Sequence, residues 1–142
     1  MWDRCPSPNS GVEFLYRYEK GSPDAGKVMH AGFKLGKEHF MAMETGLKAH
    51  KFDFTQAFSF AVNCSRQKEV DFYWQKLSKG GKKGQCGWLE DKYGVSWQVD
   101  PVEFEGMIRS KDSLKAERAI AAMMKMSKLD LAKLKKAFNG TI

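Results

Sequence analysis

The sequence lacks several features, and each absence excludes a class of protein. No run of about 18 apolar residues occurs, so we expect no membrane-spanning helix. The opening residues, MWDRCPSPNSG, contain no apolar core of the kind that a signal peptide needs. Cysteines are few, and Cys5, Cys64 and Cys86 are an odd number at scattered spacing. This usage is typical of reduced thiols rather than of a disulfide framework or a zinc site, so we expect a cytoplasmic protein.

What the 142 residues do contain is an excess of lysine and arginine, which gives a formal net charge of +7 at pH 7. Such a charge raises the possibility of a nucleic-acid partner. However, the lysines lie in a Gly-rich loop at 79–83 and between apolar positions at 111–136, as on a solvated helix face. No helix-turn-helix, zinc-finger or RNP-type motif is present. The pattern argues against a nucleic-acid partner and leaves a basic-tail interaction as a lesser alternative.

Alternating residue patterns predict strands in the first hundred residues. The expected strands are VEFLYRY at 12–18, VMHAGFKL and EHFMAME on either side of Gly36-Lys37, FSFAV at 58–62, and segments at 84–89 and 95–99 joined by the corner EDKYG. We expect the pair around Gly36-Lys37 to be an antiparallel hairpin.

Helical spacing appears in two places. After a possible cap at Ser65, an apolar stripe formed by Val70, Tyr73, Trp74 and Leu77 predicts one helix. After Pro101 the pattern is helical at 104–108 and 114–126, and it restarts at a capping-box-like pair, Ser127 and Asp130. We therefore expect an irregular segment at 1–11, a sheet domain at 12–100 with modules at 12–50 and 55–100, and C-terminal helices at 101–142.

The runs VMHAGFKLGKEHFMAME, FSFAVNC, EVDFYWQKLSKGG and GQCGWLEDKYGVSWQVDP carry a resemblance to a known family. Across nearly the whole chain, the sequence resembles the PhnB-like (3-demethylubiquinone 3-methyltransferase-like) branch of the glyoxalase/bleomycin-resistance/dioxygenase, or vicinal oxygen chelate, superfamily. The resemblance implies an α+β fold of paired βαβββ modules, here with a C-terminal helical tail, whose curved sheet forms a cup.

One departure from the family concerns the first module. Family members open with a strand and a helix that MWDRCPSPNSG is too short to supply, so we expect an incomplete first module. An unpaired sheet edge and an uncovered apolar face are costly in water. We therefore expect a homodimer, formed by module pairing or swapping.

The run GQCGWLEDKYGVSWQVDP separates into two sets of alternating side chains. Leu89, Val95, Trp97 and Val99 form the more apolar set, which we expect to pack under helices. The second set is Cys86, Trp88, Ser96 and Gln98. The resemblance implies that these side chains face the cup, together with alternate residues of the first hairpin and of FSFAV. The candidate ligand-binding residues are His30, Phe40, Glu44, Ser59, Cys86, Trp88, Ser96 and Gln98. Trp88 is the foremost candidate, because a ring can stack on a flat or cationic ligand, and a core role is its alternative.

The resemblance also implies where metal-using relatives take their ligands. These positions match Ala57, Ala42 and Gln98, where a His or Glu is usual, and a position on the first strand, which this sequence lacks. Alanine cannot bind a metal, and a neutral Gln oxygen is a poor substitute for a carboxylate. A cofactor such as S-adenosylmethionine needs a Gly-rich turn between a strand and a helix, and none is present. We expect neither a metal nor a cofactor.

Together with these residues, the resemblance implies a metal-independent protein that sequesters or senses a small hydrophobic or aromatic molecule. The alternative is a metal-independent enzyme that uses His30, Glu44 or Cys86 on a small carbonyl or quinone-like compound. His30 and Glu44 could form an acid–base pair, or else His30 satisfies a neighbour and Glu44 lies in solvent. Cys86 could be a nucleophile or a small buried apolar residue. His39 and His50 have no evident partners and are expected at the surface.

Overall fold

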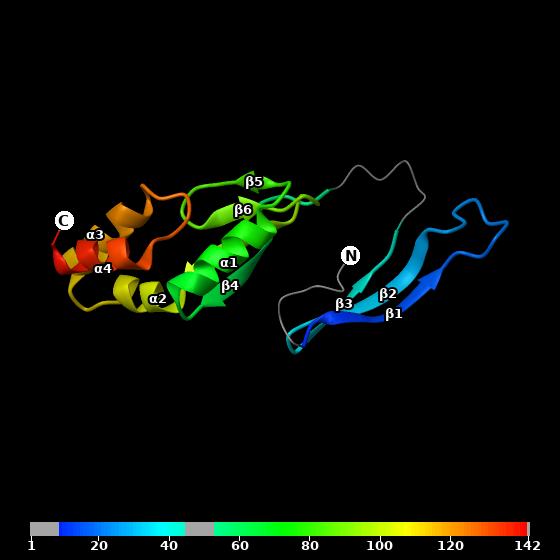
Figure 1. Ribbon diagram of the computed structural model, residues 1–142, viewed down its shortest axis with the longest axis horizontal. Coiled ribbons are helices and arrows are strands. Elements are labelled where there is room, and N and C mark those ends of the chain that lie inside the picture. Colours follow the sequence, from blue (N-terminus) through cyan, green and yellow to red (C-terminus); the bar gives the residue numbers. More distant parts are fainter. Residues whose placement is uncertain (1–8, 45–52, 142) are drawn as a thin grey trace. The chain divides into compact units, whose positions relative to one another are not determined.

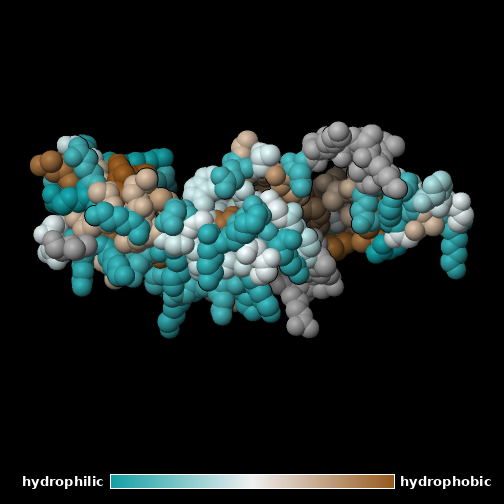
Figure 2. Space-filling view, turned by 90° about the horizontal axis from the view of Figure 1, so that it is seen from above, coloured by the Kyte–Doolittle hydropathy of each residue, from teal (hydrophilic) through white to brown (hydrophobic). Residues whose placement is uncertain are grey.

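The computed structural model describes residues 9–44 and 53–141, and the chain divides into two compact units at 1–52 and 53–142. Cys5 and His50 lie outside the described residues, as does most of the expected irregular segment at 1–11. Hydrophilic side chains project from much of the visible face of the second unit (Figure 2). Within the described residues, no helix has the length and apolarity that a membrane crossing requires.

The first unit contains an antiparallel sheet in the order β1-β2-β3 (Figure 1). Its strands are β1 (Gly11–Arg17), β2 (Val28–Leu35) and β3 (Glu38–Ala42). The predicted hairpin is confirmed: Gly36 turns the chain with a φ of 65°, and Phe33 stacks on Phe40 across the pair with ring centroids 5.3 Å apart. A turn with positive φ favours glycine, which explains this residue at the corner.

The second unit begins with a βαβββ module, as the family resemblance implies. Its elements are β4 (Ser59–Cys64), α1 (Gln67–Leu77), β5 (Lys82–Lys83), β6 (Trp88–Glu90) and β7 (Ser96–Pro101). The sheet order is β4-β7-β6-β5, with β4 parallel to β7 and the other pairs antiparallel. The strand predicted at 84–89 is shorter than expected, because Cys86 and Gly87 have φ values of 57° and 83° and form a turn before β6.

Helix α1 packs on one face of this sheet. Its buried residues Val70 and Trp74 join a core that also contains Cys64, Leu89, Trp97 and Val99. The apolar set predicted from alternation is therefore confirmed, with Val95 partly buried against it. The predicted cap is wrong: the helix follows Arg66, and Glu69 instead accepts a hydrogen bond of 2.7 Å from the Ser65 backbone N–H. Burial raises the pKa of the Cys64 thiol to about 11, helped by the nearby charges of Glu69 and Asp100.

Three helices follow the sheet: α2 (Val102–Ile108), α3 (Ser113–Met123) and α4 (Leu131–Asn139). They enclose a second core of Phe104, Met107, Ala119, Leu129, Leu131 and Leu134. Gly140 ends α4 by capping it in the left-handed conformation with a φ of 72°. Of the predicted capping pair Ser127 and Asp130, only Asp130 caps the helix. Asp130 caps α4 by accepting from the Lys133 N–H, whereas the Ser127 hydroxyl bonds elsewhere.

Candidate functional site

The face of the second sheet opposite α1 carries mainly polar side chains. The register places Asn63 beside Asp100, Ala61 beside Gln98, and Ser59 beside Ser96 along β4 and β7. Trp88 on β6 pairs with Gln98 from the other side. Because directly paired residues of neighbouring strands point to the same face, these side chains form one continuous polar and aromatic surface.

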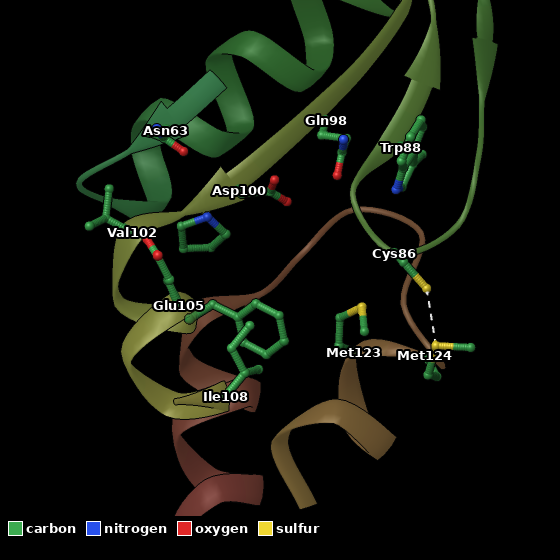
Figure 3. A pocket seen from close by; sticks show the side chains of 12 residues that line it. Asn63, Cys86, Trp88, Gln98, Asp100, Val102, Glu105, Ile108, Met123 and Met124 are labelled. Atoms are coloured by element: carbon green, nitrogen blue, oxygen red, sulfur yellow. Dashed lines mark hydrogen bonds between the residues drawn. The ribbon is translucent and has the colours of Figure 1, made fainter. Parts of the chain in front are cut away.

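Between this surface and the C-terminal helices lies a cavity of about 450 Å³. Its lining residues are Asn63, Cys86, Trp88, Gln98, Asp100, Pro101, Val102, Phe104, Glu105, Ile108, Met123 and Met124. Figure 3 shows Trp88, Gln98 and Asp100 on the sheet side, with Ile108, Met123 and Met124 on the helices. A cavity of this size with a polar wall and an apolar wall is typical of small-molecule sites.

The orientation of Gln98 is fixed by a neighbouring strand. Its Nε2 donates a hydrogen bond of 2.9 Å to the Oγ of Ser59, which leaves the amide oxygen as the group that can accept from a ligand. Ser96, another predicted site residue, is 3% exposed and is not among the residues lining the cavity. Ser59 therefore acts on the cavity through Gln98, and Ser96 lies in the sheet beside it.

Cys86 lies at the tip of the turn that connects β5 to β6. The turn is bonded to the segment before α4: the N–H groups of Cys86 and Gly87 donate to the carbonyl oxygens of Met126 and Ser127, at 2.7 and 2.8 Å. The Ser127 hydroxyl returns a bond of 2.5 Å to the carbonyl of Gly84. The Cys86 Sγ contacts the Met124 Sδ at 3.7 Å (Figure 3). The GQCG run thus holds the C-terminal helices against the sheet and places a thiol at the cavity rim.

Asp100 and Asn63 are cavity residues that sequence reasoning missed. Asp100 continues the alternation Ser96, Gln98, and its position just before Pro101 hid it. Burial removes water from its carboxylate and raises the pKa of Asp100. Nothing in the sequence pattern indicated Met123 or Met124, because their place at the cavity depends on how α3 packs.

Three predicted residues, His30, Phe40 and Glu44, lie in the first unit, and the first two are on different faces of its sheet. Ala31 pairs with Ala42 and Phe33 with Phe40, so Phe40 points to the same side as the odd-numbered residues of β2. His30 points to the opposite side. His30 and Phe40 therefore do not share one face of this sheet, contrary to expectation, and Glu44 lies beyond the last paired residue of β3.

Other details of this unit also differ from expectation. The carboxylate of Glu44, which is exposed just beyond β3, accepts a hydrogen bond from the backbone N–H of Val28. His39 is exposed as predicted, but it does have a partner: its Nδ1 lies 2.9 Å from the Oε2 of Glu13. These contacts assign Glu44 and His39 to the ends and surface of the sheet.

The residues at the metal-ligand positions of the superfamily do not fit a divalent metal. Ala57 is exposed in the turn before β4 and has no donor atom, and the Gln98 amide is neutral and bonded to Ser59. In residues 9–44 and 53–141, no group of three or more His, Cys, Asp or Glu side chains could hold a metal ion. These residues therefore do not support metal-dependent chemistry at these positions.

Comparison with known proteins places this arrangement in a family. The family model described as 3-demethylubiquinone-9 3-methyltransferase matches residues 7–100. The chain belongs to this PhnB-like family. A solved structure described as a putative 3-demethylubiquinone-9 3-methyltransferase, PhnB protein, from Bacillus cereus is 34% identical. The match covers 67% of this chain and 81% of that one, with a TM-score of 0.62.

A second similar structure supports the fold alone. The protein PA1353 from Pseudomonas aeruginosa is 20% identical over 64% of this chain and 77% of its own, with a TM-score of 0.53. No curated protein matches the chain. The PhnB-like family and the glyoxalase-like α+β fold implied by the sequence are confirmed.

Proposed function

We propose that this PhnB-like protein binds a small hydrophobic or aromatic molecule without a metal, to sequester or sense it. The observation that carries the proposal is the cavity of about 450 Å³ in the second unit. It combines an aromatic ring, Trp88, with fixed polar groups on Gln98 and Asp100, and it faces them with apolar side chains from α2 and α3. Apolar area supplies affinity in such sites, and a few placed polar groups supply orientation.

Binding is favoured over catalysis by the surroundings that the reactive groups have within residues 9–44 and 53–141. The Cys86 thiol contacts the thioether of Met124, which cannot act as a base that would activate it. Cys64, the second cysteine among the described residues, is buried and has a raised pKa, which keeps it protonated. The Glu44 carboxylate, proposed as a partner for His30, accepts instead from the backbone N–H of Val28.

The name of the Bacillus cereus relative suggests methyl transfer, but the described residues of this chain do not provide the usual binding turn for the cofactor of that reaction. A nucleotide-like cofactor is usually held by a Gly-rich turn between a strand and a helix. In the described residues, β4 leads into α1 through Ser65 and Arg66, and β7 leads directly into α2 through Pro101. Neither connection contains glycine, so we do not extend methyl transfer to this protein.

The test is a thermal-shift screen of small aromatic compounds on protein treated with EDTA. A ligand at a hundred times its Kd stabilises the folded state by about 2.7 kcal/mol, which is a readily measured increase in Tm. We expect stabilising compounds to lose their effect in Trp88→Ala and to keep it in Phe72→Ala, which removes an exposed ring from α1. Equal effects in both variants, or stabilisation that requires added metal, would contradict the proposal.

We also propose that the sheet of the first unit is covered by a second copy of the chain. Large apolar side chains are exposed on its strands, namely Val12, Phe14, Leu15, Tyr16, Met29 and Met41. Hydrophobic surface can be seen on this unit in Figure 2. Apolar patches of this kind are costly in water and mark protein–protein contacts. Light scattering at micromolar concentration should show a dimer, and a well-folded monomer would refute this proposal.

A further inference from the structure

The cavity has an unusual charge for this protein. Its described lining includes two carboxylates, Asp100 and Glu105, and no Lys, Arg or His side chain. The chain as a whole has a net charge of +7. A local excess of acid in a basic protein opposes the general field and selects for a ligand of positive charge.

Asp100 is the more buried of the two carboxylates. It lies beside Asn63 and two residues after Gln98 on the same face of β7. In the described part of the chain it makes no ion pair, and burial alone raises its pKa. A half-buried carboxylate without a cation is unfavourable, and an incoming cation would remove that cost.

Glu105 contributes less, because its Oε1 is paired with the Nη2 of Arg109 at 2.7 Å one helical turn away on α2. The side chains of both residues are more than half exposed, so this is a weak surface pair that leaves Glu105 at the cavity rim. A ligand therefore meets one isolated carboxylate and one partly neutralised carboxylate.

The remaining polar and aromatic groups of the cavity also favour a positively charged ligand. One N–H of the Gln98 Nε2 donates to Ser59, and the amide oxygen is turned toward the cavity, where it can accept a hydrogen bond (Figure 3). The ring of Trp88, on the neighbouring strand, offers a negative π face. Acceptors and a π face together recognise an ammonium group, and Ile108, Met123 and Met124 provide a surface for an apolar body.

We propose that the ligand of this cavity is an organic cation, in which an amine or ammonium group is attached to an apolar or aromatic body. The charged group contacts Asp100, Gln98 and Trp88, and the body packs on α2 and α3. This inference rests on the proposed binding function and names the chemical class of its ligand.

The experiment uses three probes of nearly equal shape: phenylbutylamine, phenylbutanol and phenylbutyrate, which are positive, neutral and negative at pH 7. Binding to the full chain is followed by NMR, through the indole Nε1–H signal of Trp88, which Trp88→Phe identifies. Each titration is repeated with Asp100→Asn and with Glu117→Gln, which removes the same charge from an exposed position on α3 outside the cavity.

We expect the amine to bind about tenfold tighter than the alcohol, and the carboxylate to bind weakest. Asp100→Asn should abolish the preference for the amine, and Glu117→Gln should retain it. If the amine and the alcohol bind equally, or if the preference survives Asp100→Asn, the inference fails while the binding function stands. If no probe moves the Trp88 signal at millimolar concentration, both fail.

Discussion

The Nε2 of Gln98 donates a hydrogen bond of 2.9 Å to the Oγ of Ser59, across the parallel pair of strands β7 and β4. This bond uses one of the two N–H groups of the amide and fixes its orientation, with the amide oxygen facing the cavity (Figure 3). The resemblance described above implies that Gln98 occupies a position where metal-using members of the superfamily carry a carboxylate. Its bond to Ser59 makes it a fixed neutral acceptor in this protein.

The energy of this contact can be measured with a double-mutant cycle. Ser59→Ala and Gln98→Ala each remove one partner, and the double variant removes both. We expect a coupling of about 1 kcal/mol in the free energy of unfolding, which is typical of a partly buried neutral hydrogen bond. Urea denaturation provides the measurement, and strictly additive losses would show that the bond contributes nothing.

Asp100→Asn should stabilise the protein at neutral pH. The folded-state pKa of Asp100 lies above its usual value of 3.8, so folding is favoured when the group is protonated. This contribution is fully present below pH 3.8 and is lost as the pH rises through the folded-state pKa. The amide has no charge to desolvate, so the gain should be present at pH 7 and disappear in acid.

Urea unfolding of both proteins across this pH range tests that prediction. The variant Asp71→Asn is a control whose effect on stability should have the opposite pH dependence. Hydrogen bonds from Lys128 and Gln67 lower the pKa of Asp71, so its ionised form is the one that folding favours. Stability from Asp71 should be present at neutral pH and be lost in acid. An Asp100→Asn variant less stable than the wild type at pH 7 would contradict the assignment.

Cys86→Gly should be more stable than Cys86→Ala. Cys86 has a φ of 57°, where a side chain costs roughly 1 kcal/mol and glycine has no such cost. Both variants remove the sulfur contact with Met124, so their difference isolates the backbone. We expect Gly to exceed Ala by about 0.5–1 kcal/mol in the free energy of unfolding. Equal stability would show that the turn does not hold this conformation in solution.

Gly87→Ala should disrupt the junction between the sheet and the C-terminal helices. A Cβ at this position would lie 3.2 Å from the Cγ of Leu129 and 3.1 Å from the Oδ1 of Asp100. Gly94→Ala is the matched control, because its φ of 84° is close to the 83° of Gly87 and its surroundings are open. We expect Gly87→Ala to cost about 1 kcal/mol more than Gly94→Ala, by urea denaturation.

Much of the fold could be predicted from local patterns. The alternation of Leu89, Trp97 and Val99 identified the face that packs under α1, because strand side chains alternate with a fixed period. The ends of the segments were harder. Ser65 and Ser127 look like helix caps in sequence, but Ser65 donates its N–H to Glu69, and the Ser127 hydroxyl bonds the carbonyl of Gly84. Caps depend on which partner the folded chain brings near.

The site was predicted in part. Cys86, Trp88 and Gln98 line the cavity, and Ser59 supports Gln98. The helix side of the cavity could not be found, because the position of Met123 and Met124 is set by tertiary packing. The first hairpin shows a different error. His30 and Phe40 were assigned to one face, although the register around Gly36-Lys37 places them on opposite faces.

The cavity beside Trp88 and Gln98 is proposed to bind a small molecule without a metal. A crystal structure of protein purified with EDTA and soaked with small aromatic amines and alcohols tests it most directly. We predict electron density for a compound in the cavity, in contact with the Trp88 ring and with Gln98 or Asp100, and no metal ion beside it. Compounds bound only outside the cavity, or a metal ion coordinated within it, would contradict the account.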